Sequence, residues 1–328
     1  MKTTFRYPIA FLALSLLLPA APATRAADYH LLKEIPVGGD GGWDYLSVDS
    51  AARRLYVTHG TKIVVIDLDK ETVAGEITDT PGVHGFAIAP ELGLGFSSNG
   101  REAKASVVEL KTLKTTAKVE TGQNPDSILF EPGAQEVYAF NGHGNSATVF
   151  EARTGRVTAT IALSGKPEFC AADPKAGRVY VNIEDKNEIV VIDTKKHEVV
   201  SHWPIAPGEE ASGMAYDAAH QRLFIECGNK LMAMIDAASG KVVATVPIGA
   251  GVDANAFDPG TQLAFSSNGE GTVTIAHEDG PDKLTVVQTL KTEPHARTMA
   301  LDPATHKIYL ANGVRSTPGS FKILVYGQ

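Results

Sequence analysis

The sequence lacks the short motifs that mark many hydrolases and nucleotide-binding enzymes. It contains no G-x-S-x-G elbow, no P-loop, no H-E-x-x-H and no C-x-x-C. The stretch GGDGG at 38–42 is rich in glycine, but no helical pattern follows it, so it predicts a turn and not a phosphate-binding loop. No local motif therefore assigns a catalytic class.

Cysteine and clustered positive charge are also scarce. The two cysteines, Cys170 and Cys227, are too few for a disulfide scaffold, and their spacing leaves open whether they pair. The chain has 38 acidic and 30 basic residues, with no run of Lys or Arg. An acidic surface repels phosphate backbones, so nucleic acid is not an expected partner.

Long apolar runs are confined to the first residues. Lys2 and Arg6 precede the run IAFLALSLLL and a stretch of small residues, which predicts a signal peptide over residues 1–26 and no membrane span. Cleavage after Ala23 or after Ala26 fits equally well. We expect a periplasmic or secreted monomer with one domain over residues 27–328. Removing Lys2, Arg6 and Arg25 leaves 27 basic and 38 acidic residues, a net charge of −11.

A repeat of about 42 residues runs through the rest of the chain. A turn dipeptide, most often Asp-Pro, begins at residues 49, 89, 131, 173, 217, 258 and 302, at spacings of 40, 42, 42, 44, 41 and 44 residues. We call the first residue of each dipeptide the anchor. Seven positions after each anchor stands an aromatic residue: Tyr56, Phe96, Tyr138, Tyr180, Phe224, Phe265 and Tyr309. This constant register predicts seven copies of one structural unit.

Each repeat has the pattern of several short strands. Runs rich in Val, Ile and aromatic residues alternate with Gly, Pro, Asn and Asp, and no segment keeps helical spacing over three turns. Four strands in about 42 residues predict an all-β, seven-bladed β-propeller. The seventh copy lacks a fourth strand, and YHLLKEIPVGG near the N-terminus resembles the fourth strands of other copies. We therefore expect the N-terminal strand to complete the last blade.

The repeats also resemble a known family. The segments RLYVTHG, RVYVNIE, VVIDTKKHEVV and GKVVATVPIG are similar to the YVTN-type repeats of YncE-like β-propeller proteins, over nearly all of the chain after residue 26. The resemblance implies the propeller fold. It implies little about activity, because propellers of this broad type include ligand binders, protein-interaction platforms, lactonases and lyases.

One repeat position collects ionisable residues. In a propeller the first strand of each blade lines the central channel, and five residues before the anchors six of seven residues are ionisable. We call this set the polar ring: Asp44, His84, Asp126, Glu168, Ser212, Asp253 and Arg297. Two residues nearer the anchors the same strands are mostly apolar. Polar residues at a solvated channel mouth also carry little desolvation cost, so composition alone does not establish a site.

Blade four departs from the others near the same end of the channel. After the second strand six copies carry Gly, in four of them preceded by Asn, which is ordinary turn chemistry, but blade four carries Glu184. We expect Glu184 to lie near Glu168, although a solvated surface Glu fits as well. Trp43 could pack, cap the channel or bind a ring-shaped ligand.

These residues predict a site on the top face, where first strands begin and second strands end. Its expected ligand residues are Asp44, His84, Asp126, Glu168, Glu184, Asp253 and Arg297. Crowded carboxylates raise one another's pKa or require a cation, so a divalent ion is expected, Ca²⁺ or Mg²⁺ on oxygen ligands and Zn²⁺ if imidazole joins. The expected metal ligands are Glu168, Glu184, Asp253 and His84.

Two classes of function remain open from the sequence. The first is an exported binding or interaction propeller whose acidic funnel holds a small ligand, a cation or a protein partner. The second is a metal-assisted lactonase, hydrolase or lyase, with a carboxylate or His84 moving the proton and Arg297 holding a substrate carboxylate. A purely structural role at the cell envelope needs no site. The fold does not choose among them, and the absence of a complete catalytic motif favours binding.

Overall fold

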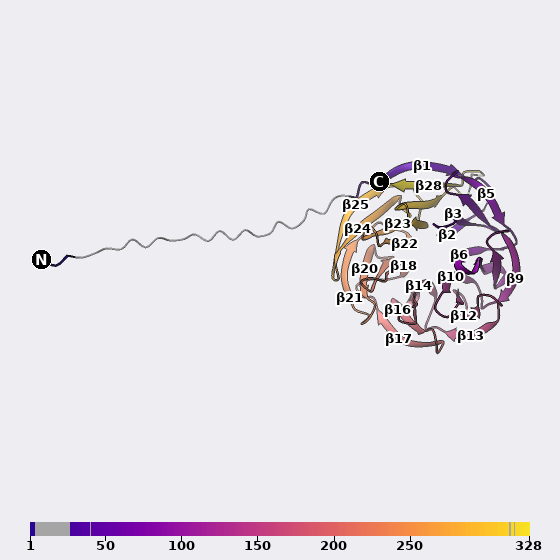
Figure 1. Ribbon diagram of the computed structural model, residues 1–328, viewed down its shortest axis with the longest axis horizontal. Helices are drawn as coiled ribbons and strands as arrows, with labels where there is room; N and C mark the ends of the chain where they lie inside the picture. Colours follow the sequence, from indigo (N-terminus) through magenta and orange to yellow (C-terminus); the bar gives the residue numbers. More distant parts are fainter. Residues whose placement is uncertain (4–26, 40, 315, 318) are drawn as a thin grey trace.

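Seven four-stranded antiparallel sheets surround a central axis in the computed structural model (Figure 1). The structure describes residues 1–3, 27–39, 41–314, 316–317 and 319–328. The all-β, seven-bladed propeller predicted from the repeat is confirmed. The predicted signal peptide lies, except for its first three residues, outside this described part. Within the described part, no helix is long and apolar enough to cross a membrane.

In six blades the strands run outward from the axis in chain order, and in the seventh the N-terminal strand β1 (His30–Pro36) lies outside β28 (Lys322–Gly327). The innermost strands are β2 (Trp43–Asp49), β6 (Val83–Ala89), β10 (Pro125–Glu131), β14 (Pro167–Asp173), β18 (Ala211–Asp217), β22 (Val252–Asp258) and β26 (Met299–Asp302). The second strands are β3 (Arg54–His59), β7 (Leu94–Asn99), β11 (Glu136–Asn141), β15 (Arg178–Ile183), β19 (Arg222–Cys227), β23 (Leu263–Asn268) and β27 (Lys307–Asn312).

The two outer positions complete the blades. The third strands are β4 (Lys62–Asp67), β8 (Lys104–Glu109), β12 (Ser146–Glu151), β16 (Glu188–Asp193), β20 (Leu231–Asp236), β24 (Thr272–Gly280) and β28 (Lys322–Gly327). The fourth strands are β5 (Thr72–Ile77), β9 (Lys114–Glu120), β13 (Val157–Ala162), β17 (Glu198–Pro204), β21 (Val242–Pro247), β25 (Lys283–Lys291) and β1 (His30–Pro36). Short 3₁₀ turns are η1 (Pro90–Leu92), η2 (Gly100–Glu102) and η3 (Glu184–Lys186).

Burial explains the sequence pattern of the repeat. The second and third strands are covered on both faces by neighbouring blades, and β3 and β4 each bury nearly every residue. Strands buried on both faces need continuous apolar runs, whereas the outer strand β17 alternates between exposed and partly buried residues. The seven aromatic residues of the repeat all lie in the core between blades, none more than 3% exposed.

The N-terminal strand β1 closes the ring, as predicted. It pairs antiparallel with β28, with His30 opposite Gly327 and Pro36 opposite Lys322. The strand is held by Ile35, which is 1% exposed and packs in the core shared by blades seven and one. Tyr29 adds to this, because its hydroxyl donates a 2.7 Å hydrogen bond to the carbonyl of His306. The ring therefore has no open seam.

Closure by β1 predicts a large loss of stability for Ile35→Ala and a small one for Leu31→Ala on the same strand. Ile35 is buried, so its truncation leaves a cavity and should cost about 2–5 kcal/mol. Leu31 is 45% exposed, so its change should stay near 0.5 kcal/mol. Urea unfolding followed by fluorescence measures both. Equal midpoints for the two variants would show that β1 does not hold the ring closed.

Candidate functional site

The polar ring lies where the innermost strands bulge. In β2 the pairing with β3 shifts between Trp43 and Leu46, and β6, β10, β14, β18 and β22 carry corresponding shifts. A bulge re-aims the side chains of the residues it contains. The bulge residues include the ring residues Asp44, His84, Asp126, Glu168, Ser212 and Asp253. Six of the seven blades thus present their ring side chain from the same kind of local distortion, and the seventh presents Arg297 from the segment before β26.

Side chains of preceding blades fix the backbone of the ring residues. The hydroxyl of Ser98 donates to the carbonyl oxygen of Asp126, and Ser127 does the same to Glu168. Further round, the bonds are Asn182 Nδ2 to the Ser212 carbonyl (2.7 Å), Ser212 Oγ to the Asp253 carbonyl (3.4 Å) and Ser267 Oγ to the Arg297 carbonyl. These bonds tie neighbouring blades together at the level of the ring.

His84 lies between two ring carboxylates. Its Nδ1 is 2.7 Å from Asp44 Oδ2 and 3.6 Å from Asp126 Oδ1. Burial favours the neutral ring, but the hydrogen bond to Asp44 and the charges of Asp126 and Asp44 raise the pKa of His84 to about 9. Ligand atoms of the three residues all lie within 4.8 Å of one another. This group could hold a metal ion, or His84 itself could serve as the cation.

Glu184 joins the site through a residue that the sequence reasoning missed. The ammonium group of Lys166 lies 3.0 Å from Glu168 Oε1 and also contacts Glu184 Oε2. The expectation that Glu184 would lie near Glu168 thus agrees with the structure. Lys166 stands two residues before Glu168, so strand alternation could have identified it.

Arg297 pairs with Asp253. Its Nε lies 3.0 Å from Asp253 Oδ2, but that oxygen has no hydrogen-bond partner among the described residues. The strand β26 starts only at Met299, so Arg297 precedes it, and its side chain is 52% exposed. The Asp253 side chain is 11% exposed. The pair therefore leaves a buried carboxylate oxygen without a hydrogen-bond donor.

The buried carboxyl groups of the ring have abnormal pKa values. Burial is the main cause, and the charges of other site carboxylates add to it. The pKa is raised to about 6 for Asp126, about 8 for Glu168 and about 7 for Asp253. Five carboxylates, with Glu184 included, face three cations, a formal charge of −2 when His84 is protonated. The site is short of positive charge.

Two aromatic rings close the channel beneath the polar ring. Tyr45 of blade one and Phe169 of blade four meet edge to face with their centroids 5.0 Å apart. Burial and the charges of Asp253, Asp126, Glu168 and Asp44 all raise the pKa of the Tyr45 hydroxyl. The Tyr45 side chain is buried next to these carboxylates, one residue after Asp44 in the chain. The sequence signal was available, because Tyr45 and Phe169 are the two aromatic residues at a repeat position otherwise held by small residues.

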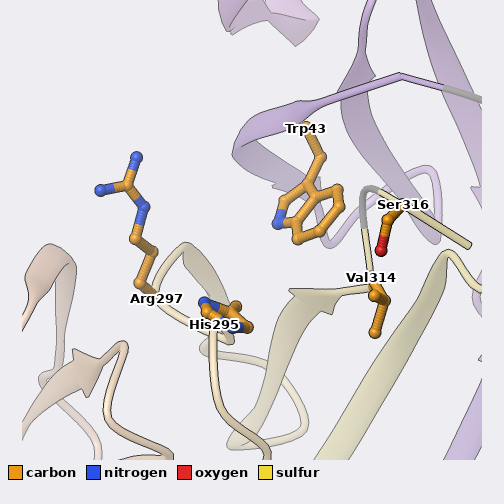
Figure 2. A pocket seen from close by; sticks show the side chains of 6 residues that line it. Trp43, His295, Arg297, Val314 and Ser316 are labelled. Atoms are coloured by element: carbon orange, nitrogen blue, oxygen red, sulfur yellow. The ribbon is translucent and has the colours of Figure 1, made fainter.

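A hollow opens beside the polar ring, between blades seven and one. It measures about 550 Å³ and is lined by Trp43, His295, Arg297, Gly313, Val314 and Ser316. In Figure 2, Arg297 and His295 lie on one side of this hollow, and Trp43, Val314 and Ser316 lie on the other. Trp43 also stacks on Phe321, with centroids 5.2 Å apart, so it both packs and lines the hollow.

The glycines after the second strands serve mainly for close approach. Of the six, Gly60 alone has a positive φ, of 66°. At Gly100 a Cβ atom would lie 2.8 Å from His84 Nε2, so a larger residue would push against the ring histidine. Glu184 begins the 3₁₀ turn η3, whose left-handed residue is Asn187. The Glu184 backbone therefore needs no glycine.

The metal ligands expected from the sequence do not form one cluster. Among the described residues, the groups with three ligand atoms within 4.8 Å are Asp44–His84–Asp126 here and Asp217–His220–Glu278 elsewhere. Of the four expected ligands, His84 alone belongs to one of these groups. Glu168 and Glu184 share Lys166, and Asp253 pairs with Arg297.

The two cysteines are separate thiols. Cys170 lies on β14 and Cys227 on β19, and both are free and buried. Burial raises the pKa of each to about 12, so neither is a ready nucleophile. Their contribution is to the apolar layer below the polar ring and to the core of blade five.

Solved structures of similar fold extend over most of the chain. One is titled as hydrazine synthase of Kuenenia stuttgartiensis, with a TM-score of 0.74, 16% identity, and coverage of 84% of this chain and 94% of that one. Another belongs to a crystal structure of the mitotic checkpoint complex, with a TM-score of 0.79, 12% identity and 99% coverage of both chains. No protein-family model and no curated protein matches the sequence. At these identities the similarity shows the fold alone.

The raised pKa values predict that stability falls as pH rises. Asp126, Glu168 and Asp253 keep protons in the folded state that the unfolded chain has released, so unfolding becomes easier between about pH 5 and pH 8. The stability from His84 is present below about pH 6.5 and is lost as pH rises through about 9. Each group contributes a slope of at most about 1.4 kcal/mol per pH unit.

Asp253→Asn should flatten this pH dependence, because it removes one buried titrating group. Asp282→Asn, at an exposed position, is the matched control and should leave the slope unchanged. Urea unfolding at pH 5.5, 7 and 8.5 gives the free energy of unfolding for all three proteins. Equal slopes for wild type and Asp253→Asn would contradict the assignment.

Proposed function

We propose that the protein is an exported, monomeric binding propeller of the YncE-like kind, whose top-face funnel holds a small cationic ligand. The single observation that carries the proposal is the deficit of positive charge in the funnel. Three buried carboxyl groups there have raised pKa values, although three cations already lie beside them. A bound cation would stabilise the ionised carboxylates against both their burial and their mutual repulsion, without moving the blades.

The floor of the funnel favours an organic ammonium ion over a bare metal ion. Tyr45 and Phe169 present aromatic rings at the base, and aromatic rings attract cations. The unsatisfied Oδ2 of Asp253 can accept a hydrogen bond from an ammonium group. The neighbouring hollow with Arg297 and Trp43 leaves room for the rest of such a molecule.

A metal-dependent hydrolase, lactonase or lyase is the second candidate, and the Asp44–His84–Asp126 group is the observation that favours it. A divalent ion there would displace the proton of His84 and polarise a substrate carbonyl. Arg297, half exposed, would hold a carboxylate of the substrate. A panel of lactones and esters assayed with and without Zn²⁺, Mn²⁺ or Ca²⁺ tests this candidate.

Cation binding predicts that organic amines stabilise the protein and that ring variants lose the effect. Putrescine and choline, as probes, should raise the melting temperature of the wild type. In calorimetric titration Glu168→Gln should weaken binding about 10- to 100-fold, because one charged hydrogen bond is worth about 1.5–3 kcal/mol.

The control is Glu91→Gln, at an exposed position on η1, which should bind like the wild type. Acetate, as an anionic probe, should give no shift. Binding that is undiminished in Glu168→Gln, or a shift with Zn²⁺ alone that Asp44→Asn abolishes, would favour the second candidate over the first.

Export predicts a shortened N-terminus in the native host. Edman sequencing or intact-mass measurement of protein from the periplasmic or culture fraction should give a start at Thr24 or at Ala27, after loss of the apolar run. Recovery of the chain with Met1 intact from the cytoplasm would refute this part of the proposal and leave the binding proposal untouched.

A further inference from the structure

Glu278 breaks the repeat on the bottom face, opposite the funnel. In six blades the backbone N–H of the corresponding residue donates to a carbonyl of the turn after the innermost strand, as Glu278 does to Gln262 at 2.9 Å. The other five residues at this position are small or apolar, or carry a single hydroxyl: Leu68, Leu110, Ala152, Thr194 and Ala237. The Glu278 side chain is 1% exposed. A carboxylate therefore occupies a buried position that the fold elsewhere gives to a neutral side chain.

Its neighbours are a second carboxylate and an imidazole. The side chain of Asp217, 3% exposed, lies in blade five across the junction from Glu278. His220 Nδ1 is 2.6 Å from Asp217 Oδ2 and 3.5 Å from Glu278 Oε2. Neither oxygen of Glu278 has a hydrogen-bond partner among the described residues. The imidazole of His220 is thus closer to Asp217, and Glu278 lies in the group without a hydrogen-bond donor in the part of the chain that the structure describes.

At three other blade junctions the anchor carboxylate accepts a hydrogen bond. There a donor reaches it from the following blade: Tyr216 OH to Asp173 (2.7 Å), His306 Nδ1 to Asp258 (2.6 Å) and Arg53 Nη1 to Asp302 (2.7 Å). At the junction of blades five and six, the following blade brings Glu278 instead. Two buried carboxylates meet where the architecture otherwise joins a carboxylate to a donor.

The group opens to solvent on one side. A hollow of about 110 Å³ is lined by His220 and Glu278, with His277 and Asp279 further along its wall. One water needs only about 10–15 Å³, so an ion with bound waters fits there. Ligand atoms of Asp217, His220 and Glu278 all lie within 4.8 Å of one another.

We propose that Asp217, His220 and Glu278 bind a first-row divalent metal ion at the junction of blades five and six. Two carboxylate oxygens and one imidazole nitrogen suit Zn²⁺ or Mn²⁺, with water completing the coordination. The ion takes the place of the donor that reaches the anchor carboxylate at those three junctions, so its role is to join the two blades. This proposal is independent of the ligand in the funnel.

Zn²⁺ titration of the chelator-treated, full-length chain tests the site. Glu278→Leu copies the residue of blades one and two, so it should fold and bind one Zn²⁺ equivalent fewer than the wild type. Glu278→Gln keeps the shape and should weaken this binding at least as much as the roughly 10- to 100-fold cost of losing an outer-shell partner. Glu270→Gln, exposed on the same blade, is the matched control.

The readouts separate this site from the funnel. Zn²⁺ held by Asp44, His84 and Asp126 would survive in Glu278→Leu and be lost in Asp44→Asn. We expect one Zn²⁺ equivalent to be lost in Glu278→Leu and kept in Asp44→Asn. Crystals of the wild type should also show an anomalous zinc peak between Asp217, His220 and Glu278. Equal Zn²⁺ stoichiometry in wild type and Glu278→Leu, with no such peak, would overturn the proposal.

Discussion

The polar ring depends on hydrogen bonds that one blade donates to the backbone of the next. Ser98, Ser127 and Ser267 reach the carbonyl oxygens of Asp126, Glu168 and Arg297, at the level where the strands bulge. Carboxylates that repel one another would move apart if their backbones could yield. Because the carbonyls are held from the side, the carboxyl groups stay buried and close together. Burial, with their mutual repulsion added, then raises their pKa values.

Cations flank the carboxylates of the polar ring. Lys166, His84 and Arg297 each sit beside one or two carboxylates of their own or a neighbouring blade. The charges of four ring carboxylates together raise the pKa of the Tyr45 hydroxyl. This arrangement differs from an ordinary wet channel mouth, in which each charge is solvated separately. The carboxyl groups of Asp126, Glu168 and Asp253 are buried, so their charges are screened less than those on the surface.

The repeat made the fold and most of the polar ring predictable from sequence. A constant register of seven anchors and aromatics determines the blade number, and rotational symmetry then brings one repeat position to one axis. Symmetry says nothing of residues that break it. Lys166 was missed because it stands outside the ring position, and the Tyr45–Phe169 contact was missed because it depends on how wide the channel is. The pairing of the expected metal ligands with Lys166 and Arg297 follows from side-chain reach, which spacing alone does not contain.

The closure by β1 also sets an order of events in folding. The strand His30–Pro36 lies near the start of the chain, and its partner strand, Lys322–Gly327, lies at the end. Contacts so distant in sequence form late, since the entropy of closing so long a loop precedes any gain from pairing. Blade seven, which carries Arg297, is therefore the last to be completed. In a chain that is cut short before Lys322–Gly327, β1 has no partner strand and the ring stays open, whatever the state of the first six blades.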